Sequence, residues 1–143
     1  MSQTPAARLS LLAFHWISWG LIVLIFGVPT AAVVLPFRLG DPGPVLGVVL
    51  LLLAPIEYVT LFVVVAGLLS MPYQRAIVPG RFPRDLSVPL YRARRLYGLC
   101  WTAVYYFKPL YWVALSLPPM KRLLFRLFGY RGSMDFTVHP DTW

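Results

Sequence analysis

Acidic residues are scarce in this chain of 143 residues: five Asp and Glu stand against 13 Lys and Arg, which gives a formal net charge of +8. Charged residues make up only 13% of the sequence and hydrophobic residues 59%, whereas soluble domains carry about 25% charged residues. A lipid bilayer is therefore the expected solvent. Because the arginines stand next to apolar runs and no nucleic-acid recognition motif is present, we expect anionic lipids as partners and no nucleic acid.

Motifs of catalysis and metal binding are missing as well. Cys100 is the only cysteine, so an internal disulfide is excluded, and no Cys/His cluster has the spacing of a metal site. The sequence has no GxGxxG, P-loop, GxSxG or HExxH motif and no paired carboxylates. The two histidines, His15 and His139, are isolated in the sequence. We predict no catalytic residue, no metal and no cofactor, and a chain that is not an enzyme by itself.

Two long apolar runs fill the first half of the sequence. Residues 9–37 contain no Asp, Glu, Lys or Arg, and residues 45–70 contain one, Glu57. Each run exceeds the roughly 20 residues that a membrane-spanning helix needs. The sequence RLGDPGP between them, residues 38–44, has the Gly, Pro and Asp of a turn. The pattern predicts a transmembrane hairpin over residues 1–70.

Glu57 lies near the middle of the second run, at the depth where a charge is most costly. An acid within a membrane helix is often part of a functional site. The alternative is a structural carboxyl that is protonated or hydrogen-bonded by a neighbour such as Thr60.

Residues 71–96 differ in kind, because six arginines and four prolines follow one another there with a single acid, Asp85. The prolines exclude one long helix. The excess of positive charge predicts a basic cytoplasmic segment, which places the N-terminus in the cytoplasm too.

A third apolar run, residues 97–117, is long enough to cross a membrane but has Lys108 and Pro109 in its middle, and both of its flanks are basic. We favour a re-entrant hairpin or a bent interfacial helix over a crossing. In a re-entrant hairpin, the arm formed by residues 97–107 would reach roughly 16 Å, about half of the hydrocarbon core. Lys108 would then meet Glu57 within about 4 Å as an intramembrane charge pair. In an interfacial helix, Lys108 would instead extend to the headgroups.

Residues 120–131 have the pattern of a basic amphipathic helix that ends at Gly129. Its apolar side chains share one face, which we expect to lie on a membrane surface; packing on a neighbouring protein domain is the alternative. The cations expected to contact lipid headgroups are Arg92, Arg94, Arg95, Lys121, Arg122 and Arg126.

The residue pattern changes in the C-terminal tail, residues 132–143. There Met134, Phe136 and Val138 alternate with polar residues, as in a half-buried strand. The patterns together predict an all-α integral membrane protein with a two-helix transmembrane hairpin, a re-entrant or interfacial helical pair, a basic amphipathic surface helix and a short extended tail. The expected segments are residues 1–70, 71–96, 97–131 and 132–143.

The stretch RLLFRLFGYRGSMDFTVHPDTW, residues 122–143, resembles a junction in a family of large bacterial membrane proteins. In that family, membrane helices precede or interrupt left-handed β-helix domains of the hexapeptide-repeat acyltransferase type, and similar regions occur in the C-terminal part of nonribosomal-peptide-synthetase-like proteins. The positions that fit the family pattern are Gly129, Tyr130, Arg131, Gly132, Asp135, Phe136, Pro140, Asp141 and Trp143.

The resemblance implies that the tail leads into a β-helix domain, which would carry the catalytic histidine and is absent from this sequence. Two functions follow. The first is a non-catalytic membrane anchor or scaffold, related to the membrane part of a β-helix acyltransferase. The second is a small accessory subunit that stabilises a larger bacterial membrane complex, such as an energy-transducing one, against lipid or pigment. We expect a multi-pass protein of the bacterial cytoplasmic (inner) membrane.

Overall fold

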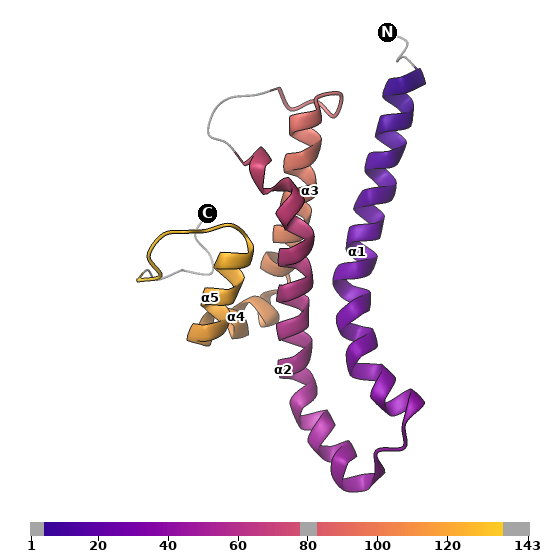
Figure 1. Cartoon of the computed structure of the whole chain (residues 1–143), viewed down its shortest axis with the longest axis vertical. Helices are drawn as coiled ribbons and strands as arrows, with labels where there is room; N and C mark the ends of the chain where they lie inside the picture. Colours follow the sequence, from indigo (N-terminus) through magenta and orange to yellow (C-terminus); the bar gives the residue numbers. More distant parts are fainter. Residues whose placement is uncertain (1–4, 78–82, 136–143) are drawn as a thin grey trace.

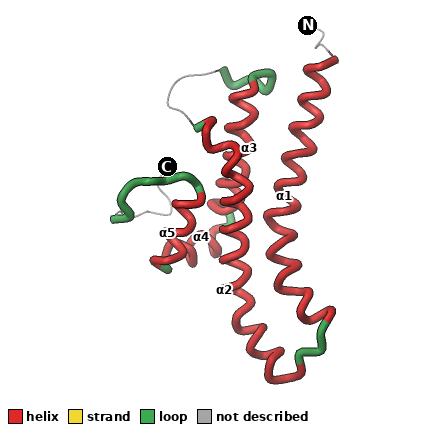
Figure 2. The backbone as a smooth tube through the Cα atoms, viewed as in Figure 1, coloured by secondary structure: helices red, strands yellow, loops and turns green. Residues whose placement is uncertain are grey.

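The computed structural model describes residues 5–77 and 83–135, and all regular secondary structure in this part of the chain is helical (Figures 1 and 2). The strand-like alternation of the tail falls largely on residues outside the described part. The elements are α1 (Pro5–Leu39), α2 (Gly43–Ser70), the 3₁₀ helix η1 (Met71–Ala76), α3 (Pro89–Tyr106), α4 (Lys108–Ser116) and α5 (Pro118–Leu127).

The two long helices form the predicted hairpin, and a short turn joins them (Figure 1). Gly43 enters α2 with a φ of +65°, a conformation that favours glycine. Both helices are long and apolar enough to cross a membrane. They meet where the rings of Phe26 and Phe62 pack edge to face, with centroids 5.1 Å apart.

The basic segment contains more helix than the sequence suggested. η1 continues directly from α2, and α3 begins at Pro89, so residues 89–96 form its first two turns. Proline at the start of a helix loses no hydrogen bond, and the Leu, Ala and Arg that follow are good helix formers. The Asp85 carboxylate accepts hydrogen bonds from the Ser87 amide and hydroxyl just before α3.

The chain reverses direction after α3. The break falls at Phe107, directly before Lys108 and Pro109, and a second break falls at Leu117, before two prolines. Within residues 97–117, α4 packs back on α3, since the rings of Trp101 and Tyr111 lie edge to face with centroids 6.4 Å apart. The end of α5 reaches the middle of α3, where the Tyr97 hydroxyl donates to the Phe128 carbonyl over 3.0 Å.

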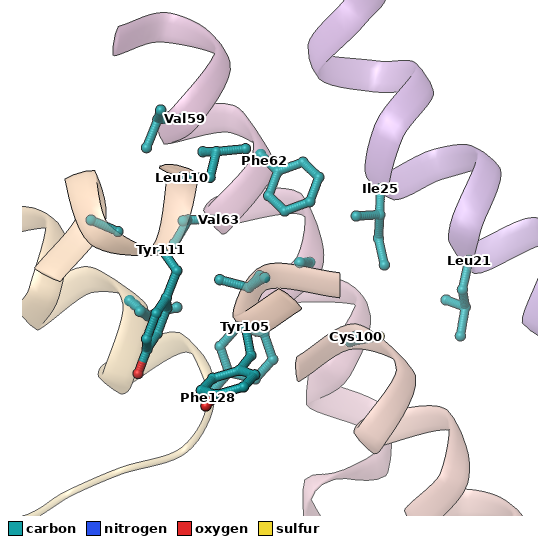
Figure 3. Packing of buried hydrophobic residues seen from close by; sticks show 14 of the residues in the cluster. Leu21, Ile25, Val59, Phe62, Val63, Cys100, Tyr105, Leu110, Tyr111 and Phe128 are labelled. Atoms are coloured by element: carbon teal, nitrogen blue, oxygen red, sulfur yellow. The ribbon is translucent and has the colours of Figure 1, made fainter. Parts of the chain in front are cut away.

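α5 lies beside α2 and runs in the same direction. The Thr60 hydroxyl of α2 donates a long hydrogen bond of 3.8 Å to the sulfur of Met120 in the first turn of α5. Further along both helices, Leu127 at the end of α5 packs on Gly67 of α2. One hydrophobic core joins α2, α3, α4 and α5, and Leu21 and Ile25 of α1 point into it (Figure 3).

The apolar face of α5 packs on the chain itself. Leu124 is completely buried and Phe128 nearly so, within the core formed by the other helices. The sequence suggested a face that lies on a membrane surface; instead, the protein covers it. α5 ends at Leu127, two residues before the glycine that was predicted to end it. Gly129 has a φ of +91°, and its amide donates to the Arg126 carbonyl.

Candidate membrane-facing site

A close contact fixes the end of α5 against α2. Gly67 is buried, and a Cβ added to it would lie only 2.5 Å from the Cβ of Leu127. The absence of a side chain lets the two helices approach closely, as small residues do between membrane helices. We call this contact, together with the hydrogen bonds of Gln74 described next, the α5 seat.

Gln74 completes the α5 seat from η1. Its amide nitrogen donates to the carbonyl of Leu127 over 2.6 Å and to the hydroxyl of Ser70 over 3.3 Å. It thus satisfies one of the carbonyls that the end of α5 leaves without a helical partner. A Cβ on Gly129 would lie 2.9 Å from the oxygen of the same amide, so glycine also suits this position sterically.

Two of the cations expected at lipid headgroups also contact the backbone that follows α5. The Lys121 ammonium donates to the Met134 carbonyl, and the Arg126 guanidinium donates to the Tyr130 carbonyl, each over 3.3 Å. The exposed side of α5 therefore holds residues 130–134 close to it. Sequence reasoning missed this role, because the acceptors are backbone carbonyls that no residue pattern marks.

The cations of α3 lie at a different place. Arg94 is half-buried and Arg95 exposed, and both line a cavity of about 860 Å³ between α3 and α1. His15 lines the same cavity from α1. The structure thus brings together an isolated histidine and two of the predicted headgroup ligands.

Glu57 and Lys108 have different surroundings. Glu57 is exposed on the face of α2 that points away from the buried residues Val59, Phe62 and Ala66. Lys108 is partly buried, and its ammonium lies 4.0 Å from the centre of the Tyr105 ring, a cation–π distance. The pair between Glu57 and Lys108 stays a prediction.

Within residues 5–77 and 83–135, no three His, Cys, Asp or Glu side chains gather as metal ligands would. Cys100 is fully buried, which keeps its thiol away from a soluble substrate.

Comparisons with models of protein families, with curated proteins and with solved structures find no match to this chain. The resemblance to the membrane region of β-helix acyltransferase-like proteins thus rests on residues 122–143 and stays a prediction.

Proposed function

We propose that the chain is a membrane anchor that holds the segment beginning at residue 130 in a fixed position at the cytoplasmic face of a bacterial inner membrane. The observation that carries this proposal is the α5 seat. The Gly67 contact and the hydrogen bond of Gln74 fasten α5 to α2 and η1, and the hydrogen bond of Tyr97 fastens it to α3. A tail that leaves such a helix has a defined starting point and direction.

The uncovered end of the hairpin supports a place in the bilayer. The buried residues of α2 begin only at Val59, and the large apolar side chains between residues 45 and 56 are exposed. Exposure of so many Leu and Val side chains to water is unfavourable, whereas contact of these side chains with lipid tails is favourable. Trp16 and Trp19 are also exposed, near the other end of α1, where indole rings favour the membrane interface.

The position of α3–α5 along the hairpin supports the non-crossing alternative. α4 lies near Val59 and Phe62 (Figure 3), while α3 packs against η1 and α5 ends at Gly67. From Ser70 back to Val59, α2 rises roughly 16 Å, about half of a bilayer's hydrocarbon core. All three helices would thus remain in the cytoplasmic half, with Lys108 within reach of the headgroups.

The resemblance suggests what the anchor would hold, namely a β-helix domain of the acyltransferase type. In that case the chain would position catalysis that another domain performs. None of the residues described here needs a catalytic role for this function.

Glu57 favours a second candidate, an accessory subunit within a larger membrane complex. Glu57 is exposed, as are its helix neighbours Leu53 and Ile56. A charge on a lipid-facing surface is costly, and a cation on a partner helix would offset that cost. Co-purification in mild detergent tests this candidate: a stoichiometric partner that Glu57→Gln releases would favour it over the anchor alone.

Proteolysis of the full chain in liposomes tests the anchor. In anionic liposomes we expect the bond after Arg131 to resist trypsin. Arg122→Glu with Arg126→Glu should weaken attachment of the tail by about 1 kcal/mol per removed charge, plus the repulsion from the new acids. Arg38→Glu, at the opposite end of the hairpin, is the matched control and should change nothing.

The lipid dependence separates the two causes of such a loss. If the arginines act on headgroups, the difference between variants should shrink in zwitterionic liposomes. If the arginines act only through the backbone of the tail, the difference between the variants should be the same in anionic and in zwitterionic liposomes. Equal protection of wild type and double variant in anionic liposomes would refute a cytoplasmic-face attachment through α5.

A further inference from the structure

The cavity between α1 and α3 is lined by one stripe from each helix. α1 contributes Phe14, Ser18, Ile22 and Phe26, which recur every four residues on one face. α3 contributes a matching stripe that runs from Arg94 to Phe107 and in the same direction as that of α1. The cavity therefore has the shape of a groove along both helices, which we call the α1–α3 groove.

The groove is basic at one end and mainly apolar along the rest, where Thr102 and Tyr106 also contribute hydroxyl groups. Arg94, Arg95 and His15 line the end near the start of α3, whereas Phe26 and Phe107 line the far end. The basic end thus favours an anion, and two guanidinium groups suit a phosphate.

The middle of the groove offers little to a polar ligand. Ile22, Leu99 and Ala103 line it with hydrocarbon, and the Ser18 hydroxyl donates to the carbonyl of Phe14 within its own helix over 2.8 Å. Thr102 adds a hydroxyl group to this part. A hydrocarbon chain suits most of this lining.

The length of the groove matches one leaflet of a membrane. From Phe14 to Phe26, α1 rises roughly 18 Å. One leaflet comprises about 15 Å of hydrocarbon and a few Å of headgroup. The cavity of about 860 Å³ has room for a flexible acyl chain. Docking of a second helix is the alternative that the test below distinguishes.

We propose that the α1–α3 groove binds one anionic phospholipid, with its phosphate at Arg94 and Arg95 and one acyl chain along the apolar stripe toward Phe26. His15 supplies a further hydrogen-bond donor at the phosphate end. This site rests on the proposed membrane location, but it is a single defined position and not a general attraction to anionic surfaces.

Gly98 offers a direct way to block the groove. It lines the groove in the middle of α3, and a Cβ placed on it would meet no atom of the protein within 4 Å. Gly98→Leu should therefore fill the groove without a clash, and leucine is the better helix former. Gly20→Leu is the matched control, because Gly20 is also helical, also has open space around its Cβ and does not line the groove.

Native mass spectrometry of the delipidated full chain in neutral detergent is the test, with phosphatidylglycerol and phosphatidylcholine of identical acyl chains as probes. We expect one phosphatidylglycerol per chain, bound at least several-fold more strongly than phosphatidylcholine. Gly98→Leu should lower this occupancy at least tenfold, and Gly20→Leu should retain it. Arg94→Gln with Arg95→Gln should weaken phosphatidylglycerol binding about 30-fold, from about fivefold per arginine, and remove the preference for it.

Three results would overturn the proposal: equal binding of the two lipids, unchanged binding by Gly98→Leu, or a dimer of the chain that forms without lipid and is lost in Gly98→Leu. The last result would make the groove a helix-docking site. Circular dichroism of each variant shows that it is folded. Release of the wild-type chain from membranes by alkaline carbonate without detergent would refute the anchor itself, whatever Gly98→Leu does.

Discussion

Gly67→Ala tests the α5 seat with the smallest possible change, one methyl group. The new Cβ would lie 2.5 Å from the Cβ and 3.1 Å from the Cδ1 of Leu127. Because the nearest atom is a Cβ, rotation of the Leu127 side chain cannot relieve the clash. The end of α5 must move away from α2, which would lengthen the hydrogen bond from Gln74 to the Leu127 carbonyl.

The magnitude follows from two opposing effects. Overpacking of a tight contact costs about 1–3 kcal/mol, while alanine stabilises a helix interior by up to about 1 kcal/mol relative to glycine. Gly27→Ala on α1 shares the second effect and lacks the first, because no atom lies within 4 Å of its Cβ position. The two variants should thus differ by about 1–3 kcal/mol in the free energy of unfolding, with Gly67→Ala the less stable.

Thermal unfolding in mild detergent measures the difference, which at about 2–4 °C per kcal/mol amounts to roughly 2–12 °C in Tm. Trypsin should also cleave after Arg131 faster in Gly67→Ala than in Gly27→Ala, because the start of the tail moves with α5. If Gly67→Ala proves as stable as Gly27→Ala and its tail is cleaved no faster, α5 does not sit against Gly67 and the anchor loses its main support.

Three further predictions concern topology, pH and the charge pair. In a Cys100→Ala background, single cysteines should label from outside the membrane at one position and from inside at the other three: outside at 41, inside at 3, 85 and 135. Labelling of 135 from outside would mean that α3 and α4 cross. Hydrogen bonds from the Ser87 hydroxyl, which has the larger effect, and from the Ser87 amide lower the pKa of Asp85. The contribution of these bonds to folding stability is therefore complete above the ordinary carboxyl pKa and is lost as pH falls through the lowered pKa. Ser87→Ala should raise that pKa in an NMR titration. If Glu57 and Lys108 meet, Glu57→Gln should destabilise the wild type more than it destabilises the Lys108→Met variant, whereas additive effects of the two substitutions would show that the residues do not meet.

The helical hairpin and the break in the third apolar run could be predicted from the sequence. A run such as residues 9–37 has few alternatives to a long apolar helix, and Gly and Pro are clustered where α1 ends at Leu39 and α2 begins at Gly43, whereas the single prolines Pro29, Pro36 and Pro55 lie inside helices. Lys108 and Pro109 interrupt the third run, and the helix indeed breaks at Phe107. These are local properties of the chain, so one sequence suffices to read them.

The sequence does not predict whether the apolar face of each helix contacts lipid or another part of the protein. An amphipathic helix such as α5 has the same pattern whether its apolar face meets lipid or protein, since both are hydrocarbon. The burial of Leu124 depends on the return of α5 along α2, which only the spatial arrangement reveals. Gly67 likewise stands among many small residues of a membrane helix, and nothing in the sequence marks it as the one that Leu127 approaches.

α3 links the two surfaces proposed to have a function. It buries Leu96 and Cys100 in the shared core, it presents the Tyr97 hydroxyl to the end of α5, and it lines the groove toward α1 with Gly98. Consecutive residues of one helix turn by about 100°, so these neighbours necessarily face different elements. Because a packed helix moves as a unit, the phosphate end of the groove and the start of the tail keep a constant spacing. A lipid in the groove would therefore set the height of α3 relative to the headgroups, and with it the height at which the tail leaves the membrane.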